Sequence, residues 1–265
     1  YLIPLGFLTL LTGMFWIEER SNYHKLFYIF FALPTFLAIA IKPSSLKAII
    51  KNPIVIAFLV FSIYTSISLT WSEPSNDKPP LKNPLYIFLL FCGVILCQSN
   101  VKISIEKAIS AAIIIAASSA IVSSIYFLHF DIEAGKRITG YRALYNPLLS
   151  SHVYGMFAAM TLSYIALSKR TPISWGICAF SLIFFLILSG SRTPLVGIFA
   201  CLATLTVLRP TQKSLLTVAY TVVCIALAIS LKPTITESSI VSTISDRGLS
   251  LRPEIWHQTW TQIQA

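Results

Sequence analysis

Long apolar runs alternate with short polar segments along almost the whole chain. Nine runs can be marked, at residues 1–17, 26–41, 53–70, 84–99, 108–130, 146–168, 172–188, 193–208 and 214–231. We interpret them as transmembrane helices, because in lipid an open chain can satisfy its backbone hydrogen bonds only as helix. Several are at or below the length of about 17–25 residues that a spanning helix needs. The pattern predicts an all-α, polytopic membrane protein with about nine transmembrane helices.

Two regions follow from this pattern. Residues 1–232 should form a transmembrane helical domain, in which Pro34 should kink the second helix. Residues 233–265 are polar at first and should begin a large extracytoplasmic loop. Ser250 and Pro253 mark a helix start there, and apolar residues near one face make that helix amphipathic: Ile255, Trp256, Trp260 and Ile263. Because the chain stops within this helix, we expect it to be a C-terminally truncated part of a longer protein.

Composition supports a membrane location. The 265 residues are 55% hydrophobic and 11% charged, with a mean hydropathy of +0.76, whereas soluble domains carry about 25% charged residues. The net charge of +10 would suit a nucleic acid. However, the basic residues are scattered among short loops, with no basic stripe and no interleaved aromatic residues. Nucleic acid is therefore excluded as a partner, and membrane lipids are expected instead.

The cysteines and histidines indicate no metal site. All five cysteines fall inside apolar runs, where they should be small core residues without disulfides: Cys92, Cys97, Cys178, Cys201 and Cys224. No CxxC pair and no Cys/His pair has metal-ligand spacing, and the four histidines are dispersed. We expect neither a protein-built metal centre nor a cofactor.

The basic residues also predict the orientation. The segments after even-numbered runs contain only one acid, Glu106, beside Lys42, Lys47, Lys51, Lys102, Lys107, Lys169, Arg170, Arg209 and Lys213. Because positive residues concentrate on the cytoplasmic side, these segments should be cytoplasmic. The other segments, with Arg137, Arg142, Arg192, Arg247 and Arg252, should then lie outside. The functional face is expected to point away from the cytosol.

Arg192 lies in a six-residue break, Ser189–Pro194, between two apolar runs. An Arg at the centre of a membrane helix costs about 2.5–3.5 kcal/mol, so one near membrane depth is a functional candidate. Ser191 or Thr193 can cap the next helix, and Pro194 suits its first turn. Arg192 would then lie beside backbone N–H groups at a positive helix start, which is a favourable place for phosphate. The alternative is an Arg that extends to the lipid headgroups.

The third outer segment is a second candidate. Lys136, Arg137 and Arg142, interleaved with Tyr141 and Tyr145, suit an anionic, sugar-bearing ligand. The alternative is a solvated loop in which these cations pair with nearby acids, Asp131 and Glu133. Asn146-Pro147 then opens the sixth helix.

Three further features remain open. His152 lies about two turns into the sixth helix, where it is either a buried, hydrogen-bonded core residue or a proton-transfer group facing a cavity. Arg252 precedes a helix start and so repeats the anion-site pattern of Arg192. The outer acids could bind a divalent ion together with substrate phosphates, or could be solvated loop residues: Glu18, Glu19, Asp131 and Glu133.

Three of these motifs resemble those of a known protein superfamily. The Leu188-Ser189-Gly190-Ser191-Arg192-Thr193 hairpin, the Arg137-x-x-Gly140 … Asn146-Pro147 segment and the Arg252-Pro253-Glu254-Ile255-Trp256 helix start occur in the order seen in the O-antigen ligase and polymerase superfamily. The chain resembles the ligases most. The helix pattern covers the whole chain, whereas the specific motifs cover about thirty residues, of which the Ser-Gly-Ser-Arg hairpin is the most distinctive.

The resemblance implies a membrane glycosyltransferase. It would transfer a glycan from undecaprenyl pyrophosphate to lipid A–core oligosaccharide on the periplasmic face of the bacterial inner membrane, in an inverting, metal-independent reaction. Arg192 and Arg252 would hold the pyrophosphate, and we expect substrate contacts from Arg137, Tyr141, Arg142, Asn146, His152 and Ser191. The family's likely base is a histidine late in the outer loop. His257 lies too close to Arg252 to match it, so the base is expected beyond Ala265.

Other functions remain open at this point. An O-antigen polymerase or a protein O-glycosyltransferase of the same superfamily would share the donor and differ in the acceptor. A polyprenyl-monophosphate glycosyltransferase would use Glu18, Glu19 or Asp131 with a divalent ion. A lipid-linked-sugar flippase or an anion transporter would line a path through the membrane with charges, whereas nearly all charges here lie at loop level.

Overall fold

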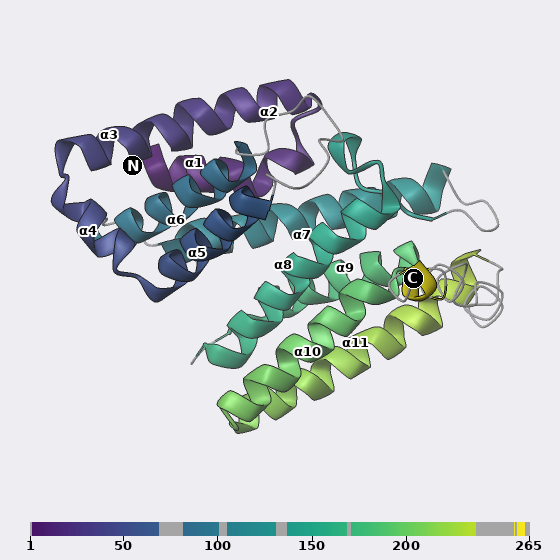
Figure 1. Cartoon of the computed structure of the whole chain (residues 1–265). Coiled ribbons are helices and arrows are strands. Elements are labelled where there is room, and N and C mark those ends of the chain that lie inside the picture. The colour runs from purple at the N-terminus through teal and green to yellow at the C-terminus, as the bar shows by residue number, and fades with distance from the viewer. Residues whose placement is uncertain are drawn as a thin grey trace. The chain divides into compact units, whose positions relative to one another are not determined.

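The computed structural model describes residues 2–68, 82–100, 105–130, 137–168, 171–236, 257 and 259–262 (Figure 1). Within these ranges every regular element is helical and no strand occurs, which confirms the all-α prediction. Each of the nine apolar runs contains helix. The elements are α1 (Leu2–Thr12), η1 (Gly13–Phe15), α2 (Arg20–Phe27), η2 (Tyr28–Ala32), α3 (Leu33–Ile41), α4 (Ser44–Ile50), α5 (Pro53–Ser68), α6 (Lys82–Asn100), α7 (Ile105–Phe130), η3 (Arg142–Leu144), α8 (Pro147–Leu167), α9 (Ile173–Ser189), α10 (Arg192–Leu208) and α11 (Gln212–Thr236).

Helix length and composition bear on the number of membrane spans. Among the described residues, three helical segments are long and apolar enough to cross a membrane: Ser21–Ile41, Glu106–Phe130 and Gln212–Leu231. Five other apolar helices are shorter, so the number of nine spans stays a prediction. Large apolar side chains are exposed on many helices, with Ile41 at 82% and Ile173 at 86%. Such a surface suits lipid contact rather than water.

Helix α4 was not anticipated from the sequence. The polar segment after the second apolar run was interpreted as a plain loop, yet Ser44–Ile50 is helical. Its Ile49 is completely buried in a small core with Val55, Cys92 and Leu96. The apolar face of this short helix therefore packs against α5 and α6, although its sequence is too short to show a helical period clearly.

The kink expected at Pro34 stays a prediction, but a π-helical turn lies just before this residue. Helices α2 and α3 form one continuous helix through η2, Tyr28–Ala32, which ends two residues before the proline. Because Pro34 has no N–H, it cannot complete the regular α-helical pattern, and a π-turn is one way for a helix to accommodate this break. Helix α1 approaches η2 closely at Gly6, where a Cβ atom would overlap the backbone of Phe30. Only glycine fits at this contact.

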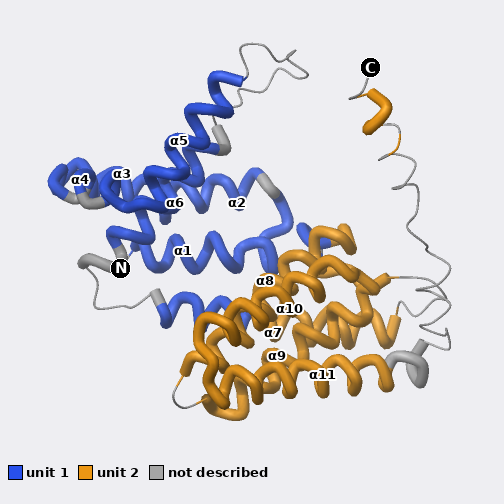
Figure 2. Tube along the Cα trace, turned by 60° about the horizontal axis from the view of Figure 1, so that its bottom comes forward, with its two compact units in different colours: residues 1–116, 141–144 blue, residues 117–140, 145–265 orange. Residues whose placement is uncertain are grey.

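The chain divides into two compact units, which are coloured separately in Figure 2. Unit 1 comprises residues 1–116 and 141–144, and unit 2 comprises residues 117–140 and 145–265. In unit 1, η2 packs against α1, and α6 packs against α3, α4 and α5. A core of buried Phe27, Phe31 and Ala32 lies between η2 and its neighbours. The short η3 helix packs against η1, at the end of α1.

Unit 2 contains a bundle of antiparallel helices, α8 to α11, which Figure 1 shows running side by side. Tyr154 lies fully buried in α8. Its hydroxyl contacts Ser119 Oγ of α7 at 2.8 Å, and its ring packs on Phe185 of α9 with 4.1 Å between centroids. Tyr220 of α11 donates to the Gly176 carbonyl of α9 at 2.6 Å. These bonds satisfy polar groups inside an otherwise apolar bundle, where unpaired ones would be costly.

The last long helix ends a few residues later than the sequence predicted. Helix α11 continues to Thr236, past the expected boundary at residue 232. Most of the loop and amphipathic helix expected in residues 233–265 lies outside the described residues, but His257 and residues 259–262 are helical and exposed. The expected division into one transmembrane domain and one loop stays a prediction. Four cysteines are free thiols, of which Cys92 and Cys224 are buried, as expected of core residues, whereas Cys178 and Cys201 are only partly buried.

One contact in unit 2 agrees with the predicted alternation of loops between the two membrane sides. Lys213 Nζ, after α10, donates to the carbonyl of Ser168 at the end of α8, at 2.6 Å. The segments that follow the sixth and eighth runs therefore lie at the same end of unit 2. We expect an impermeant maleimide to label Tyr145→Cys in intact cells, but Arg209→Cys only after permeabilisation.

A cysteine-free background is required for this labelling experiment. Both positions have exposed side chains, so accessibility of the thiol within the fold does not bias the comparison. Labelling of Arg209→Cys but not Tyr145→Cys in intact cells would reverse the predicted orientation.

Candidate functional site

A left-handed glycine forms the turn between α9 and α10. Gly190 has φ 63° and ψ 21°, a conformation that residues with a Cβ adopt only at a cost of about 1–2 kcal/mol. The buried hydroxyl of Ser189 donates to the Leu186 carbonyl at 2.7 Å, which closes the last turn of α9. The chain can therefore reverse within two residues, as the Ser-Gly-Ser-Arg motif indicated.

Helix α10 begins at Arg192. Ser191 has the extended backbone of an N-cap residue, with φ −90° and ψ 121°, but its hydroxyl makes no capping hydrogen bond. Ser191 is therefore the N-cap residue by its backbone conformation, but the hydrogen bond expected from its side chain is not formed. Pro194 lies in the first turn, as expected, and is buried, whereas Arg192 and Thr193 are exposed. Arg192 is thus the first residue of a helix that the Ser191 hydroxyl does not cap, and both its charge and the helix dipole there favour an anion.

Asn146 caps the start of α8. Its side-chain oxygen accepts from the backbone N–H groups of Leu148 at 2.9 Å and of Leu149 at 3.4 Å. Pro147 occupies the first helical position, where its missing N–H has no consequence. The Asn146-Pro147 pair therefore has a structural function as a helix start. The predicted contact of Asn146 with substrate stays a prediction.

His152 is exposed on α8, so its interpretation as a buried core residue is wrong. Its Nδ1 lies 2.6 Å from the carbonyl oxygen of Leu148, one turn earlier in the same helix. Because a carbonyl oxygen only accepts hydrogen bonds, Nδ1 carries a proton in this arrangement, and Nε2 of the neutral ring is left as the basic atom. A proton-transfer function at Nε2 remains as a prediction.

A close contact joins the third turn of α8 to the first turn of α10. A Cβ atom added to Gly155 would lie 2.5 Å from Pro194 Cβ, closer than real Cβ atoms come to other heavy atoms. Gly155 follows His152 by three residues and so lies on the same side of α8. Pro194 follows Arg192 by two residues. The contact therefore places α8, one turn after His152, against the first turn of α10, while Arg192 lies on a different side of that turn from Pro194.

The third outer segment is distributed over both units. Arg137 is half-buried and belongs to unit 2, next to the completely buried Ile138. Tyr141 is exposed and belongs to unit 1 with Arg142, whose side chain lies outside the described residues. Buried Leu144 anchors that stretch. The segment from 137 to 144 is therefore only partly solvated, because two of its side chains are fully buried.

Arg252, Lys136 and Asp131 lie outside the described residues, so the proposed convergence of Arg192 and Arg252 stays a prediction. Within the described ranges no group of three His, Cys, Asp or Glu side chains could hold a metal ion. Unit 2 contains Ser191 and Arg192 at the start of α10 and His152 in the second turn of α8. Sequence inspection missed Gly155, because a glycine within an apolar run carries no sign of which helix it will face.

Comparison with known proteins agrees with these motifs. The chain is 41% identical over 267 aligned residues to a curated protein from Pseudomonas aeruginosa named "O-antigen ligase". The alignment covers 99% of this chain, which spans 64% of that relative's length. No family model matches the chain, and no solved structure does. The apolar helices and this similarity together point to an integral membrane protein. The resemblance to the O-antigen ligase family is thereby confirmed over nearly the whole chain.

Proposed function

We propose that this chain is the donor-binding part of a membrane glycosyltransferase of the O-antigen ligase type. The enzyme moves an O-antigen-type glycan from undecaprenyl pyrophosphate to lipid A–core oligosaccharide on the periplasmic face of the bacterial inner membrane. The observation that carries the proposal is the exposed Arg192 at the start of α10, directly after the left-handed turn at Gly190. The 41% identity to an O-antigen ligase supports the same reaction class.

The chemistry of the donor explains why such a residue is needed. Breaking the glycosyl–pyrophosphate bond builds negative charge on the departing pyrophosphate. A fixed guanidinium at a positive helix start stabilises that charge more in the transition state than in the ground state. Arg252 is proposed to bind the same pyrophosphate, and Arg137, Tyr141, Arg142, Asn146, His152 and Ser191 to contact the substrates. The transfer is proposed to invert the anomeric centre without a metal ion, with a base that follows Ala265.

The distribution of charge favours an enzyme over a transporter. Among the described residues, the buried polar side chains other than Tyr154 are all Ser or Thr, and no charged side chain is buried. A flippase or an anion transporter would need polar or charged groups along a path through the membrane. Here the charges lie at helix ends and in the segments between them, which suits a reaction at the membrane surface.

A donor-discrimination assay tests the proposal. The full-length protein in vesicles is expected to transfer glycan from a polyprenyl pyrophosphate donor to lipid A–core, to leave the matching monophosphate donor unused, and to stay active with a chelator. Use of the monophosphate donor and loss of activity on chelation would instead identify a carboxylate- and metal-dependent enzyme. Growth of the glycan on the polyprenyl carrier, rather than on lipid A–core, would identify a polymerase.

A further inference from the structure

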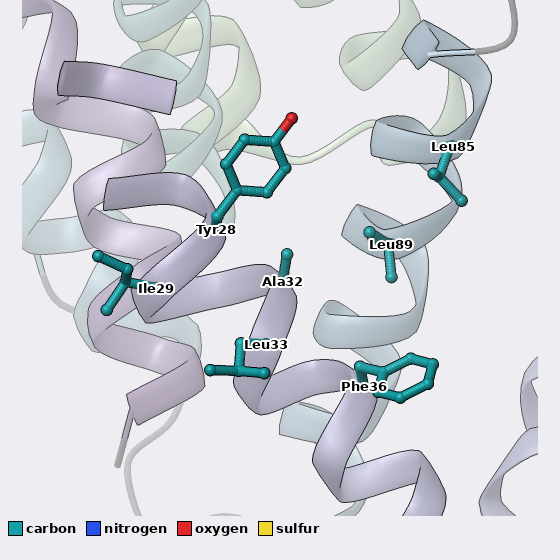
Figure 3. Close-up of a pocket in the computed structure, with 7 residues that line it drawn as sticks. All are labelled: Tyr28, Ile29, Ala32, Leu33, Phe36, Leu85 and Leu89. Atoms are coloured by element: carbon teal, nitrogen blue, oxygen red, sulfur yellow. The ribbon is translucent and has the colours of Figure 1, made fainter. Parts of the chain in front are cut away.

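Unit 1 contains an open apolar groove between α6 and the helix formed by η2 and α3. Its volume is about 560 Å³, and its lining consists of Tyr28, Ile29, Ala32, Leu33, Phe36, Leu85 and Leu89. Figure 3 shows the Tyr28 ring at one end, reaching toward α6, and Phe36 at the other end. Apart from the tyrosine hydroxyl, the lining side chains are hydrocarbon. The groove can therefore hold a hydrocarbon chain but no polar ligand.

The shape of the groove depends on the π-turn. Tyr28, Ile29 and Ala32 all belong to the π-turn, and Ala32 supplies only a methyl group to the lining. The Tyr28 and Tyr86 hydroxyls hydrogen-bond to each other, and their rings meet edge to face with 5.8 Å between centroids. This pair ties η2 to α6 at the Tyr28 end of the groove. The end that faces the start of α2 is therefore the polar end.

A cation lies beyond that polar end. Lys25 is exposed and precedes Tyr28 by three residues and Ile29 by four, so it lies on the same side of the helix as the groove. From Lys25 to Phe36 the helix rises by about 16 Å, at about 1.5 Å per residue. One leaflet of the hydrocarbon core is about 15 Å thick, half of the bilayer value. The stripe from Lys25 to Phe36 thus matches a lipid with its phosphate at Lys25 and one chain in the groove.

We propose that this groove is a binding site for an anionic phospholipid of the leaflet in which α2 begins. Lys25 pairs with the lipid phosphate, the Tyr28–Tyr86 pair lies at the interface, as amphipathic rings commonly do, and one acyl chain fills the groove down to Phe36. The site lies wholly in unit 1 and does not depend on the transfer reaction proposed for Arg192. Such a lipid would cover the exposed π-turn and so belong to the folded structure of unit 1.

Site-specific photo-crosslinking tests this proposal. The full chain carrying Phe36→p-benzoylphenylalanine is reconstituted in phosphatidylcholine vesicles with a minor fraction of phosphatidylglycerol, and lipid adducts are identified by mass spectrometry. Val222→p-benzoylphenylalanine, on an exposed position of α11, which does not line the groove, reports the bulk lipid composition. We expect phosphatidylglycerol to be enriched about fivefold at position 36 over position 222, the factor for one Lys beside an anionic lipid.

Charge variants complete the test. Lys25→Gln is expected to abolish the enrichment at position 36, and Lys25→Arg to keep it. Lys42→Gln, at the opposite end of the same membrane-length helix, should leave it unchanged. All these side chains are exposed, so the variants should fold. Equal phosphatidylglycerol content at positions 36 and 222, or enrichment that survives Lys25→Gln, would overturn the proposal.

Discussion

Arg192→Lys is expected to keep the fold and membrane insertion of the protein yet to lower glycan transfer about a hundredfold, the effect of losing roughly 3 kcal/mol of transition-state stabilisation. The side chain of Arg192 is exposed, so a Lys side chain has room in its place. The planar guanidinium can bind two phosphate oxygens at once, whereas the Lys ammonium acts as a point charge. The predicted loss therefore comes from geometry at unchanged net charge.

A matched control exists on the same helix. Arg209 is exposed at the other end of α10, where it is the C-cap residue, so Arg209→Lys makes the same chemical change on the opposite side. Transfer is measured at matched protein levels as the rate of glycan attachment to lipid A–core. Arg209→Lys should be near normal, and Arg252→Lys should behave like Arg192→Lys. If Arg192→Lys also transfers glycan at a near-normal rate, Arg192 only contacts lipid headgroups and does not hold the pyrophosphate.

Gly155→Ala is expected to destabilise the protein by about 1–3 kcal/mol, the usual effect of adding a methyl group to a well-packed contact. The new Cβ would lie 2.5 Å from Pro194 Cβ, in a ring that is fixed to the backbone of α10 and cannot rotate away. Either α8 or the first turn of α10 must move. Because that turn begins at Arg192, transfer activity should fall as well, even at temperatures where the variant is fully folded.

Gly197 provides the control for this variant. It lies in the interior of α10, and a Cβ added there would meet no heavy atom within 4 Å. Since Ala favours helix over Gly by about 1 kcal/mol, Gly197→Ala should leave stability unchanged or raise it. Thermal unfolding in detergent and transfer rates compare the two variants. Equal stability and equal activity of Gly155→Ala and Gly197→Ala would mean that the contact with Pro194 does not constrain the site.

The environment of His152 could not be predicted from the sequence. Its place two turns into an apolar run suggested either a core residue or a group in a cavity, and periodicity could not separate these, because α8 is apolar on several sides. The structure leaves the ring exposed and bonded to its own helix through Nδ1. By contrast, the cap expected from Ser191 failed because a favourable residue type at an N-cap does not fix the rotamer of its hydroxyl.

Features that depend on neighbouring residues could be predicted from the amino-acid pattern alone. Apolar runs specified the helices, and Gly190 with Pro194 specified the hairpin at Arg192, because backbone preference and helix capping act over a few residues. Which surfaces meet became visible only in the folded protein. The burial of Ile49 in α4, the fit of Gly155 against Pro194 and the groove beside the π-turn at Tyr28–Ala32 each require a second helix that is distant in sequence. Such contacts depend on how whole helices pack, which a local pattern of apolar and polar residues does not encode.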